Sequence, residues 1–328
     1  MTFPACAELQ QAPHALYFRV GSQADVVRHP RAGYALMGGG TDLDEAFRWL
    51  CDRADGGDLL VLHASGDDAY NPYINGICKV NSVATIVIPD RQATLEPLVG
   101  DKIREASAIF ISGGDQAKYV RYWRGTPVES ALRDAVKRGI PIGGTSAGLA
   151  VLGEYIYSAE NDRPDDKDLS SDEALADPFY RQVVISPDLL GIPILRGIIT
   201  DTHFDTRQRQ GRLLVFMARI LESRQATHIR GIGVDEKTAL LVEPDGSAQV
   251  VGKGAVDFFE ADQKAQVCEP GKPLSLSGIR MEHINHDEAF DVKTWHGGDR
   301  IWTVQVLPHD GKGIVAMTPA GFDNPSSK

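Results

Sequence analysis

The sequence predicts an α/β fold in which a mostly parallel sheet carries helices on both faces. Short apolar runs alternate along the chain with segments that have the apolar spacing of helices. The apolar runs are rich in β-branched residues and lack polar alternation, which is typical of strands buried on both faces. Several runs end at glycine-rich turns, and in parallel sheets the functional site lies at these carboxyl ends.

Five strands are expected in the first half of the chain. They cover residues 34–37, 59–62, 84–88, 108–111 and 140–142. Glycine-rich turns follow three of these strands, at 38–40, 113–114 and 143–148. Because the strands are parallel, the three turns should meet at one edge of the sheet.

Two helices between these strands have clear sequence signals. Thr41 or Asp42 is expected to cap the first helix. Its apolar face consists of Leu43, Ala46, Phe47, Leu50 and Cys51. The second helix is expected to begin with a capping box, with Thr126 as the cap, Pro127 as the first helical residue and Glu129 as the third. Its buried face consists of Val128, Ala131, Leu132, Ala135 and Val136.

The second half of the chain is more varied. Residues 160–177 are polar and acidic and indicate a surface loop, which is either simply solvated or a lid over the site. Beyond it, strands are expected at 195–203 and 238–243 and a helix at 213–221. The pattern then becomes β-rich, so we divide the chain into an α/β domain at 1–245 and a β-rich extension at 246–328, which is a separate module or part of the same domain.

The composition is that of a soluble globular protein of 328 residues with a formal net charge of -11. This charge argues against a nucleic-acid or anionic-membrane surface, which needs a basic patch. No apolar stretch is long enough to span a bilayer, and no signal peptide is expected in residues 1–20. Scattered cysteines without a CxxC pair predict reduced thiols in the cytoplasm rather than a disulfide framework or a zinc site. They are Cys6, Cys51, Cys78 and Cys268.

The turn after residues 140–142 contains the sequence GTSAG, with Ser146 at its centre. A G-x-S-x-G motif between a strand and a helix is typical of a nucleophile elbow, in which a strained turn exposes the serine hydroxyl. The N–H of Ala147 would then lie at a helix start and could stabilise an oxyanion. The alternative is a glycine-rich turn that only packs or binds phosphate.

A nucleophilic serine needs a base and an orienting carboxylate. His203 is expected at a strand end and is one candidate base, and His63 is the other. Asp235 or Glu236 could supply the carboxylate, and the residues alone leave both open. His283 and His286 are a weak metal pair because no further ligand spacing accompanies them.

Other polar groups are expected near the serine. The turn at 113–114 offers backbone N–H groups, and Gln116 adds a side-chain amide. Three guanidinium groups follow His203 closely, at Arg207, Arg209 and Arg212. They could hold a substrate carboxylate or pair with the acidic loop at 160–177.

Taken together, these motifs resemble the cyanophycinase-like serine exopeptidases, a family that includes peptidase E. The matching segments are MGGGTD (37–42), ISGGDQ (111–116), GGTSAGLAVLGE (143–154), DTHFDTRQRQGRL (201–213) and GIGVDEKTALLVE (231–243). The resemblance implies a flavodoxin-like sheet related to class I glutamine amidotransferases. It also implies an enzyme without metal or cofactor that cleaves bonds next to aspartate in small peptides, and a homodimer.

The resemblance further assigns roles to individual residues. Ser146 would be the nucleophile, His203 the base and Glu236 the orienting acid, with the oxyanion hole formed by the backbone of Gly114 and Ala147. The residues that would line the substrate pocket are Gln116, Asp201, Thr202, Arg207, Arg209 and Arg212. Cyanophycinases typically have Gln where this chain has Thr202, so the choice between α-aspartyl and β-aspartyl peptides stays open.

Two other functions are considered. One is a non-catalytic small-molecule or peptide-binding protein on the same scaffold. The other is a general serine esterase or amidase of the α/β-hydrolase type, which has the chain order serine, acid, histidine. Here the order is Ser146, His203, Glu236, so we place a serine peptidase first.

Overall fold

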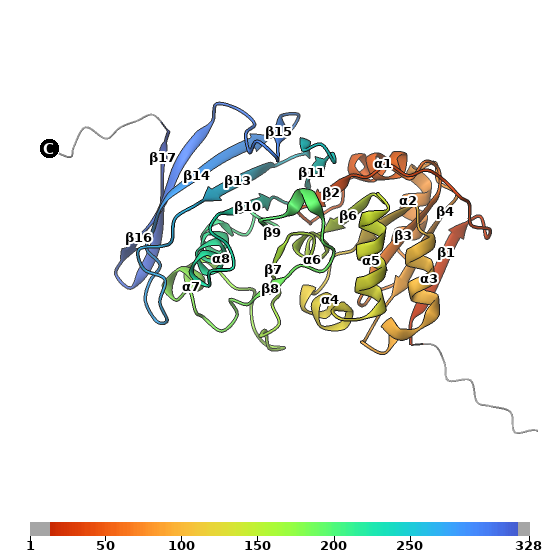
Figure 1. The fold of residues 1–328 in the computed structure, drawn as a ribbon, viewed down its shortest axis with the longest axis horizontal. Coiled ribbons are helices and arrows are strands. Elements are labelled where there is room, and N and C mark those ends of the chain that lie inside the picture. The colour runs from red at the N-terminus through yellow and green to blue at the C-terminus, as the bar shows by residue number, and fades with distance from the viewer. Residues whose placement is uncertain (1–13, 321–328) are drawn as a thin grey trace, which may run out of the picture.

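Two β-sheets form the framework of the computed structural model, which describes residues 14–320 (Figure 1). The first sheet has the strand order β1-β4-β3-β5-β6-β2-β11-β12-β15, and the second has the order β17-β16-β14-β13-β10-β9-β7-β8. Helices pack against both sheets, so the protein has the mixed α/β fold that the sequence predicts.

The centre of the first sheet is parallel. Strands β4, β3, β5, β6 and β2 run in the same direction, and antiparallel strands flank them on both sides. The bounds are β1 (Leu16–Gly21), β2 (Tyr34–Met37), β3 (Asp58–His63), β4 (Ser82–Val87), β5 (Ala108–Ile111), β6 (Ile142–Thr145), β11 (Thr238–Val242), β12 (Ser247–Gly252) and β15 (Ala289–Asp291).

Helices cover both faces of this sheet. On β3, Leu59 and Val61 point to the face that carries α1 and α2, whereas Leu60 and Leu62 point to α3, α4 and α5. The helices are α1 (Asp44–Arg53), α2 (Tyr70–Ile77), α3 (Pro97–Glu105), α4 (Gln116–Trp123) and α5 (Pro127–Lys137), with the short 3-10 helix η1 (Ala93–Leu95). The buried face of α5 consists of the five residues that its spacing predicts.

The second sheet carries α8 on one face, and most of its strands are antiparallel. Only β7, β9 and β10 are parallel to one another. Its strands are β7 (Tyr155–Tyr157), β8 (Ile185–Pro187), β9 (Ile198–Asp201), β10 (Ile229–Val234), β13 (Ala255–Ala261), β14 (Leu276–Asn285), β16 (Ile301–His309) and β17 (Lys312–Pro319). The accompanying helices are α6 (Ala147–Ala150), α7 (Ser171–Ala176), η2 (Pro193–Leu195) and α8 (Gln210–Glu222). Strands after residue 246 are shared between the sheets, since β12 and β15 join the first and the others join the second.

The cap prediction for α1 is wrong, and the one for α5 is confirmed only in position. Leu43 is the N-cap of α1, and Asp42 instead accepts hydrogen bonds from Tyr70 (2.5 Å) and from Thr145 (2.7 Å). Thr126 is the N-cap of α5 and Pro127 is its first residue, as predicted, but the capping box does not form, because the hydroxyl of Thr126 donates to the carbonyl of Trp123 (2.6 Å). A capping box is present at α7 instead, between Ser170 and Glu173. In each case the side chain forms hydrogen bonds with nearby groups outside the expected capping pattern.

The fifth strand also differs from its expected bounds. It begins at Ile142 and includes two glycines that we assigned to the turn, Gly143 and Gly144. Both lack space for a side chain, because a Cβ on Gly143 would lie 3.2 Å from Phe110 and one on Gly144 would lie 2.5 Å from the backbone of Gly148. The glycines therefore serve close packing of the strand as well as the turn.

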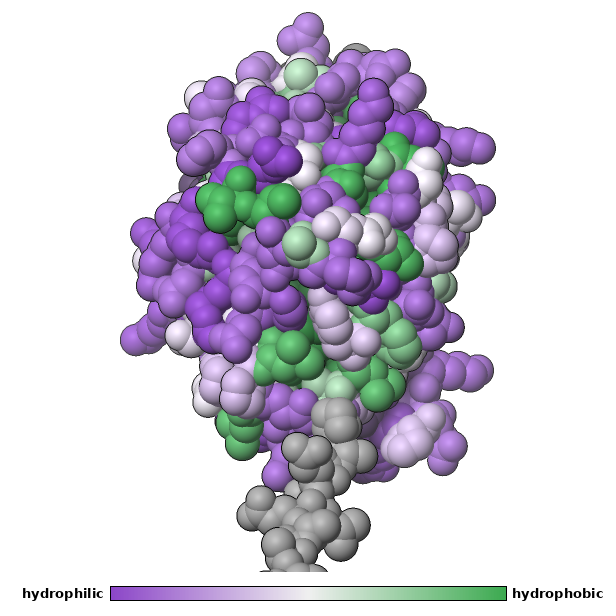
Figure 2. All heavy atoms as spheres, turned by 90° about the vertical axis from the view of Figure 1, so that its right-hand side faces the viewer, coloured by the Kyte–Doolittle hydropathy of each residue, from purple (hydrophilic) through white to green (hydrophobic). Residues whose placement is uncertain are grey.

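The edge of the first sheet at β1 is polar. Figure 2 shows this side of the molecule as mostly hydrophilic, with separate hydrophobic patches. On β1 itself, Arg19 forms ion pairs with Asp25 and with Asp58. Charged side chains of this kind protect an edge strand from pairing with other chains. Among the described residues, no helix is long and apolar enough to cross a membrane.

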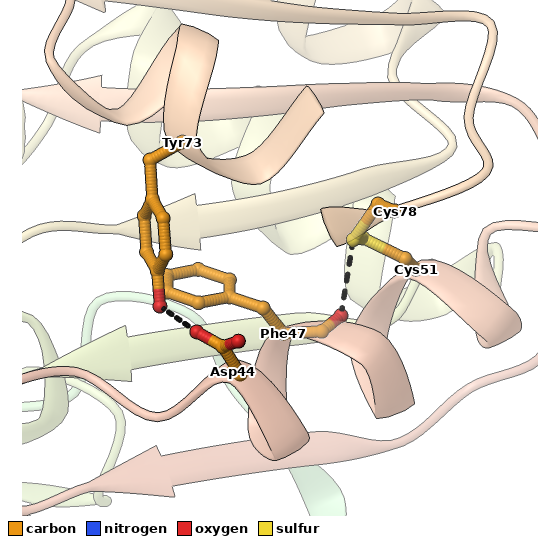
Figure 3. Close-up of a disulfide and its surroundings, with 5 residues drawn as sticks. All are labelled: Asp44, Phe47, Cys51, Tyr73 and Cys78. Carbon is orange, nitrogen blue, oxygen red and sulfur yellow. Dashed lines mark hydrogen bonds between the residues drawn. A yellow bond between two sulfur atoms is a disulfide. The ribbon is translucent and has the colours of Figure 1, made fainter. Parts of the chain in front are cut away.

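Cys51 and Cys78 form a disulfide, which corrects the prediction of reduced thiols. Figure 3 shows that the bond joins α1 to the end of α2. The same two helices meet through Phe47, which packs edge-on against Tyr73, while Tyr73 donates a hydrogen bond to Asp44 (2.7 Å). The pair is brought together by this helix packing, which the spacing of the cysteines does not reveal. Cys268 is free and buried, and Cys6 lies outside the described residues.

Reducing this disulfide is expected to lower the free energy of unfolding by about 3 kcal/mol, because the bond closes a loop whose ends are 27 residues apart. Urea unfolding followed by circular dichroism, with and without dithiothreitol, measures the change. A Cys51→Ser/Cys78→Ser variant should have the lower stability and no response to the reductant. The thiol of Cys268 should contribute little to the response to dithiothreitol, since burial raises its pKa to about 11. A fully reduced protein with unchanged stability would contradict this prediction.

Candidate active site

Ser146 lies at a sharp turn between β6 and α6. Its backbone has φ 51° and ψ -118°, a conformation that non-glycine residues rarely adopt. The turn depends on the small residues around it, since a Cβ on Gly148 would lie 2.0 Å from the carbonyl oxygen of Ile111. The N–H of Ser146 donates to the carbonyl of Met37 (3.1 Å), which ties the turn to β2. This strained strand-turn-helix geometry is that of a nucleophile elbow.

The structure brings three of the predicted side chains into one hydrogen-bonded row. The Ser146 Oγ lies 2.8 Å from the Nε2 of His203, and the Nδ1 of His203 lies 2.6 Å from a carboxylate oxygen of Glu236. His203 follows β9, and Glu236 lies in the turn between β10 and β11. A serine, a histidine and a carboxylate in this order have the geometry of a nucleophile, its base and the acid that orients the base.

The glycine turn after β2 holds the histidine in place. The N–H of His203 donates to the carbonyl of Gly38 (2.8 Å). The next residue, Gly39, has φ 101°, and a Cβ at this position would lie 2.4 Å from the imidazole ring. The turn at 38–40 therefore needs glycine because the base packs directly on it.

The surroundings of His203 favour its neutral form. Burial lowers the pKa of His203, and the positive charges of Arg207 and Arg209 lower it further, whereas Glu236 acts in the opposite direction. The side chain of His203 is 8% exposed. A neutral ring at neutral pH can accept a proton from Ser146, which is what a general base must do.

The rate of substrate turnover should therefore fall at acid pH. We expect kcat/KM to be constant near pH 7 and to decrease as the pH falls through the lowered pKa of His203, with a midpoint below its ordinary value of 6.5. Arg207→Gln should move this midpoint upward, since it removes a positive charge that lowers the pKa. A pH–rate profile of both proteins measures the shift. A midpoint above 6.5 in the wild type would contradict the assignment.

A cavity of about 230 Å³ opens beside Ser146. All the residues expected in the oxyanion hole and the substrate pocket line it, namely Gly114, Gln116, Ala147, Asp201, Thr202, Arg207, Arg209 and Arg212. Gly114 has φ 138°, and Ala147 is the first residue of α6. Their backbone N–H groups remain the candidate oxyanion donors.

The three arginines in this cavity differ in their partners. Arg212 is 3% exposed and forms a two-point ion pair with Asp201, at 2.8 and 2.6 Å. Arg209 donates to the carbonyl and the hydroxyl of Thr202 (3.0 and 3.1 Å) and to Asp168 (2.8 Å). Arg207 donates to Asp168 as well (2.7 Å). The arginines thus line the candidate pocket and also pair with the acidic loop.

The other candidates lie elsewhere. His63 is near Ser112, with its Nδ1 2.7 Å from the serine hydroxyl, and it makes no contact with Ser146. Asp235 accepts from Thr206 (2.9 Å and 2.8 Å), so it faces away from His203. The two histidines of the candidate metal pair have separate partners. The Nδ1 of His283 lies 2.6 Å from a carboxylate oxygen of Asp257, and the Nε2 of His286 lies 3.0 Å from one of Asp287. Within residues 14–320, no group of three or more His, Cys, Asp or Glu side chains could hold a metal ion.

The sequence reasoning missed two groups of site residues. Asp168 bridges Arg207 and Arg209, although only its position in an acidic loop hinted at such a role. Thr145 is tied to Asp42, so the residue before the nucleophile is linked to the loop after β2. The MGGGTD segment that includes Asp42 was the available signal.

Comparisons with known proteins point to a peptidase family. Residues 76–250, which are more than half of the chain, match peptidase family S51. A cyanophycinase from Geminocystis herdmanii is 30% identical over 198 residues, which are 58% of this chain and 65% of the relative. One from Synechococcus elongatus is 28% identical over 257 residues, 75% of this chain and 73% of the relative. The match thus spans about two thirds of the length of the cyanophycinases.

A solved structure supports the fold. The crystal structure of a peptidase from an acI-B1 actinobacterium has a TM-score of 0.51 with 16% sequence identity, over 80% of this chain and 98% of the other. An identity this low supports the common fold only. The classification comes from the sequence match over more than half of the chain: this protein belongs to peptidase family S51.

Proposed function

We propose that this protein is a serine exopeptidase that hydrolyses aspartyl or β-aspartyl peptides through an acyl-enzyme. The observation that carries the proposal is the row of hydrogen bonds from Ser146 through His203 to Glu236, on a strained turn beside a cavity. Family membership and the similarity to cyanophycinases support the same reaction class.

The proposed reaction proceeds in two steps. His203 takes the proton of Ser146 as the serine oxygen attacks the peptide carbonyl, and the backbone N–H groups of Gly114 and Ala147 stabilise the oxyanion. His203 then gives the proton to the leaving amine, which leaves an acyl group on the serine. His203 then takes a proton from water as the water attacks this ester, and it returns the proton to the oxygen of Ser146 as the acid product leaves. Glu236 holds the imidazole in its orientation throughout.

The cavity supports a small substrate. At about 230 Å³ it is below the range of about 300–1,000 Å³ that is typical for ligand pockets, so it suits the end of a peptide rather than an extended chain. Arg207 and Arg209 offer guanidinium groups to a carboxylate, and Gln116 offers an amide. Arg212 and Asp201 are committed to each other, so we assign them a supporting role in shaping the pocket.

The flavodoxin-like kinship, the homodimer and the cytoplasmic location are proposals too. Counted from β3, the order β4-β3-β5-β6 follows the 2-1-3-4 pattern of flavodoxin-like sheets, which supports that kinship, whereas β2, the first parallel strand in the chain, lies beyond β6. A homodimer stays a prediction from the resemblance. The cytoplasmic location also stays a prediction. Reduced thiols were one argument for it, and the disulfide between Cys51 and Cys78 removes that argument.

Hydrolysis of matched dipeptides tests the proposal. The purified protein is incubated with β-aspartyl-arginine, α-aspartyl-arginine and, as a control, α-glutamyl-arginine, and the release of free arginine is measured. Cleavage of an aspartyl peptide by the wild type and not by Ser146→Ala is the expected result, and the faster substrate identifies the preferred linkage. Equal cleavage by the variant, or no cleavage of either aspartyl peptide, would reject the proposal.

A non-catalytic binding protein on the same scaffold is the main alternative. It predicts that both the wild type and Ser146→Ala bind the dipeptides and that neither releases arginine. The strained backbone at Ser146 argues against it, since a binding site has no need for a serine in this conformation.

A further inference from the structure

Asp168 reaches into the candidate pocket from the acidic loop between β7 and α7. One of its carboxylate oxygens accepts hydrogen bonds from Arg207 (2.7 Å) and from Arg209 (2.8 Å) at the same time. It therefore has the position that a carboxylate of a ligand would take if these two arginines were to bind it.

The side chains of Arg209 and Asp168 are unequally exposed to solvent. The side chain of Arg209 is 8% exposed, and that of Asp168 is 63% exposed. Burial lowers the pKa of Arg209 to about 10, with the charge of Arg212 adding to the effect. A buried cation needs an anion nearby. Partial burial raises the pKa of Asp168, but the charges of Arg209, Arg212 and Arg207 outweigh it and lower the pKa, so the carboxylate is stabilised here too; its 63% exposure still lets water solvate it when another anion takes its place. The arginine is thus the fixed partner, and the carboxylate can be exchanged.

The backbone on either side of Asp168 is anchored independently of its carboxylate. Gln182 donates to the carbonyl of Lys167 (3.1 Å), and Arg212 donates to the carbonyl of Leu169 (3.2 Å). Leu169 is itself buried. The side chain of Asp168 can therefore leave the two arginines by rotating toward solvent, and the loop does not have to open.

We propose that Asp168 is a specificity-determining residue that competes, as an internal anion, with the carboxylate of the ligand for Arg207 and Arg209. A ligand must offer a carboxylate that bridges both guanidinium groups in order to displace it, and a neutral ligand gains nothing from them. The apparent affinity for an anionic ligand is reduced by the fraction of molecules in which Asp168 occupies the site. This inference rests on the proposed function for the identity of the ligand, an aspartate.

The opposite role for Asp168 is also testable. If its carboxylate served to position Arg207 and Arg209 for the ligand, removing it would weaken binding. Competition and positioning therefore predict changes of opposite sign in the same measurement.

Calorimetric titration with L-aspartate distinguishes the two roles. The measurement is made in the full chain with Ser146→Ala, with and without Asp168→Asn or Asp168→Ala, at constant ionic strength. Competition predicts a Kd that is about five- to tenfold lower in both Asp168 variants. Asp165→Asn is the matched control, since it removes the same charge from the same loop at an exposed residue with no side-chain partner recorded in residues 14–320. Its Kd should stay unchanged.

Kinetics give a second readout. In a chain with an intact Ser146, Asp168→Asn should lower KM for the aspartyl peptide with kcat nearly unchanged, because only ligand binding is affected. A higher Kd, a Kd within twofold of the parent, or no measurable binding in any variant would overturn the inference. Tighter aspartate binding without hydrolysis of any peptide by the wild type would reject the proposed function and leave the role of Asp168 in place.

Discussion

Ser146→Ala is expected to lower kcat for an aspartyl peptide by about 10⁴- to 10⁶-fold, and His203→Ala added to it should change the remaining rate very little. The reason is that the two side chains act as a unit. The Oγ of Ser146 is 2.8 Å from the imidazole, and in the proposed reaction neither group does chemistry alone. Once the serine is absent, no proton remains for the histidine to accept. Any residual rate would come from substrate binding and the oxyanion donors.

The measurement compares kcat of the two single variants and the double variant. His63→Gln is the matched control, because His63 also follows a strand of the first sheet but contacts Ser112 instead of Ser146. We expect it to retain most of the activity. Circular dichroism should show an unchanged fold in each variant. A double variant whose loss equals the product of the two single losses would contradict a serine–histidine unit.

Much of the fold could be predicted because hydrophobic patterning in the sequence directly reflects burial. The run at 108–111 is apolar throughout, and β5 is buried at every residue. Side chains that choose between several partners were harder to predict. Thr126 is the cap of α5, as its sequence signature predicts, yet its hydroxyl donates to the carbonyl of Trp123 (2.6 Å) and not to the N–H groups of the helix. The disulfide was missed for a related reason, since only the packing of α1 on α2 brings Cys51 to Cys78.

In the candidate site, too, the positions at strand ends could be predicted, whereas the choice between neighbouring side chains could not. Ser146 and His203 were candidates because each follows a strand at the edge where parallel strands end, although His63 also lies at a strand end and was the competing base. The acid could not be chosen from the residues, because neighbours in a turn can point in different directions. Glu236 faces His203, whereas Asp235 faces Thr206. The resemblance to the family indicated this choice, and the geometry agrees with it.

Arg212→Met is expected to lower the free energy of unfolding by about 3–5 kcal/mol, which would be the largest effect on stability of any change considered in this site. Arg212 and Asp201 are both at most 3% exposed, and two hydrogen bonds join them. Removing the arginine takes both of these hydrogen bonds from the buried carboxylate of Asp201, which keeps, among the described residues, only the N–H of Thr202 (2.8 Å) and the more distant Arg209 (3.9 Å). Urea unfolding measures the loss. As a control, Arg207→Gln should cost less than about 1 kcal/mol, because the side chain of Arg207 is 44% exposed.

A double variant separates a structural role of this pair from direct binding of substrate. Asp201→Leu/Arg212→Met removes both charges and should recover most of the stability, because the desolvation cost of the unpaired carboxylate disappears with it. If the pair only shapes the pocket, kcat/KM should recover together with stability. If the guanidinium of Arg212 binds the substrate, as the resemblance implies, kcat/KM should stay low in a protein that is again stable. The two readouts together therefore decide whether Arg212 supports the cavity wall or contacts the peptide.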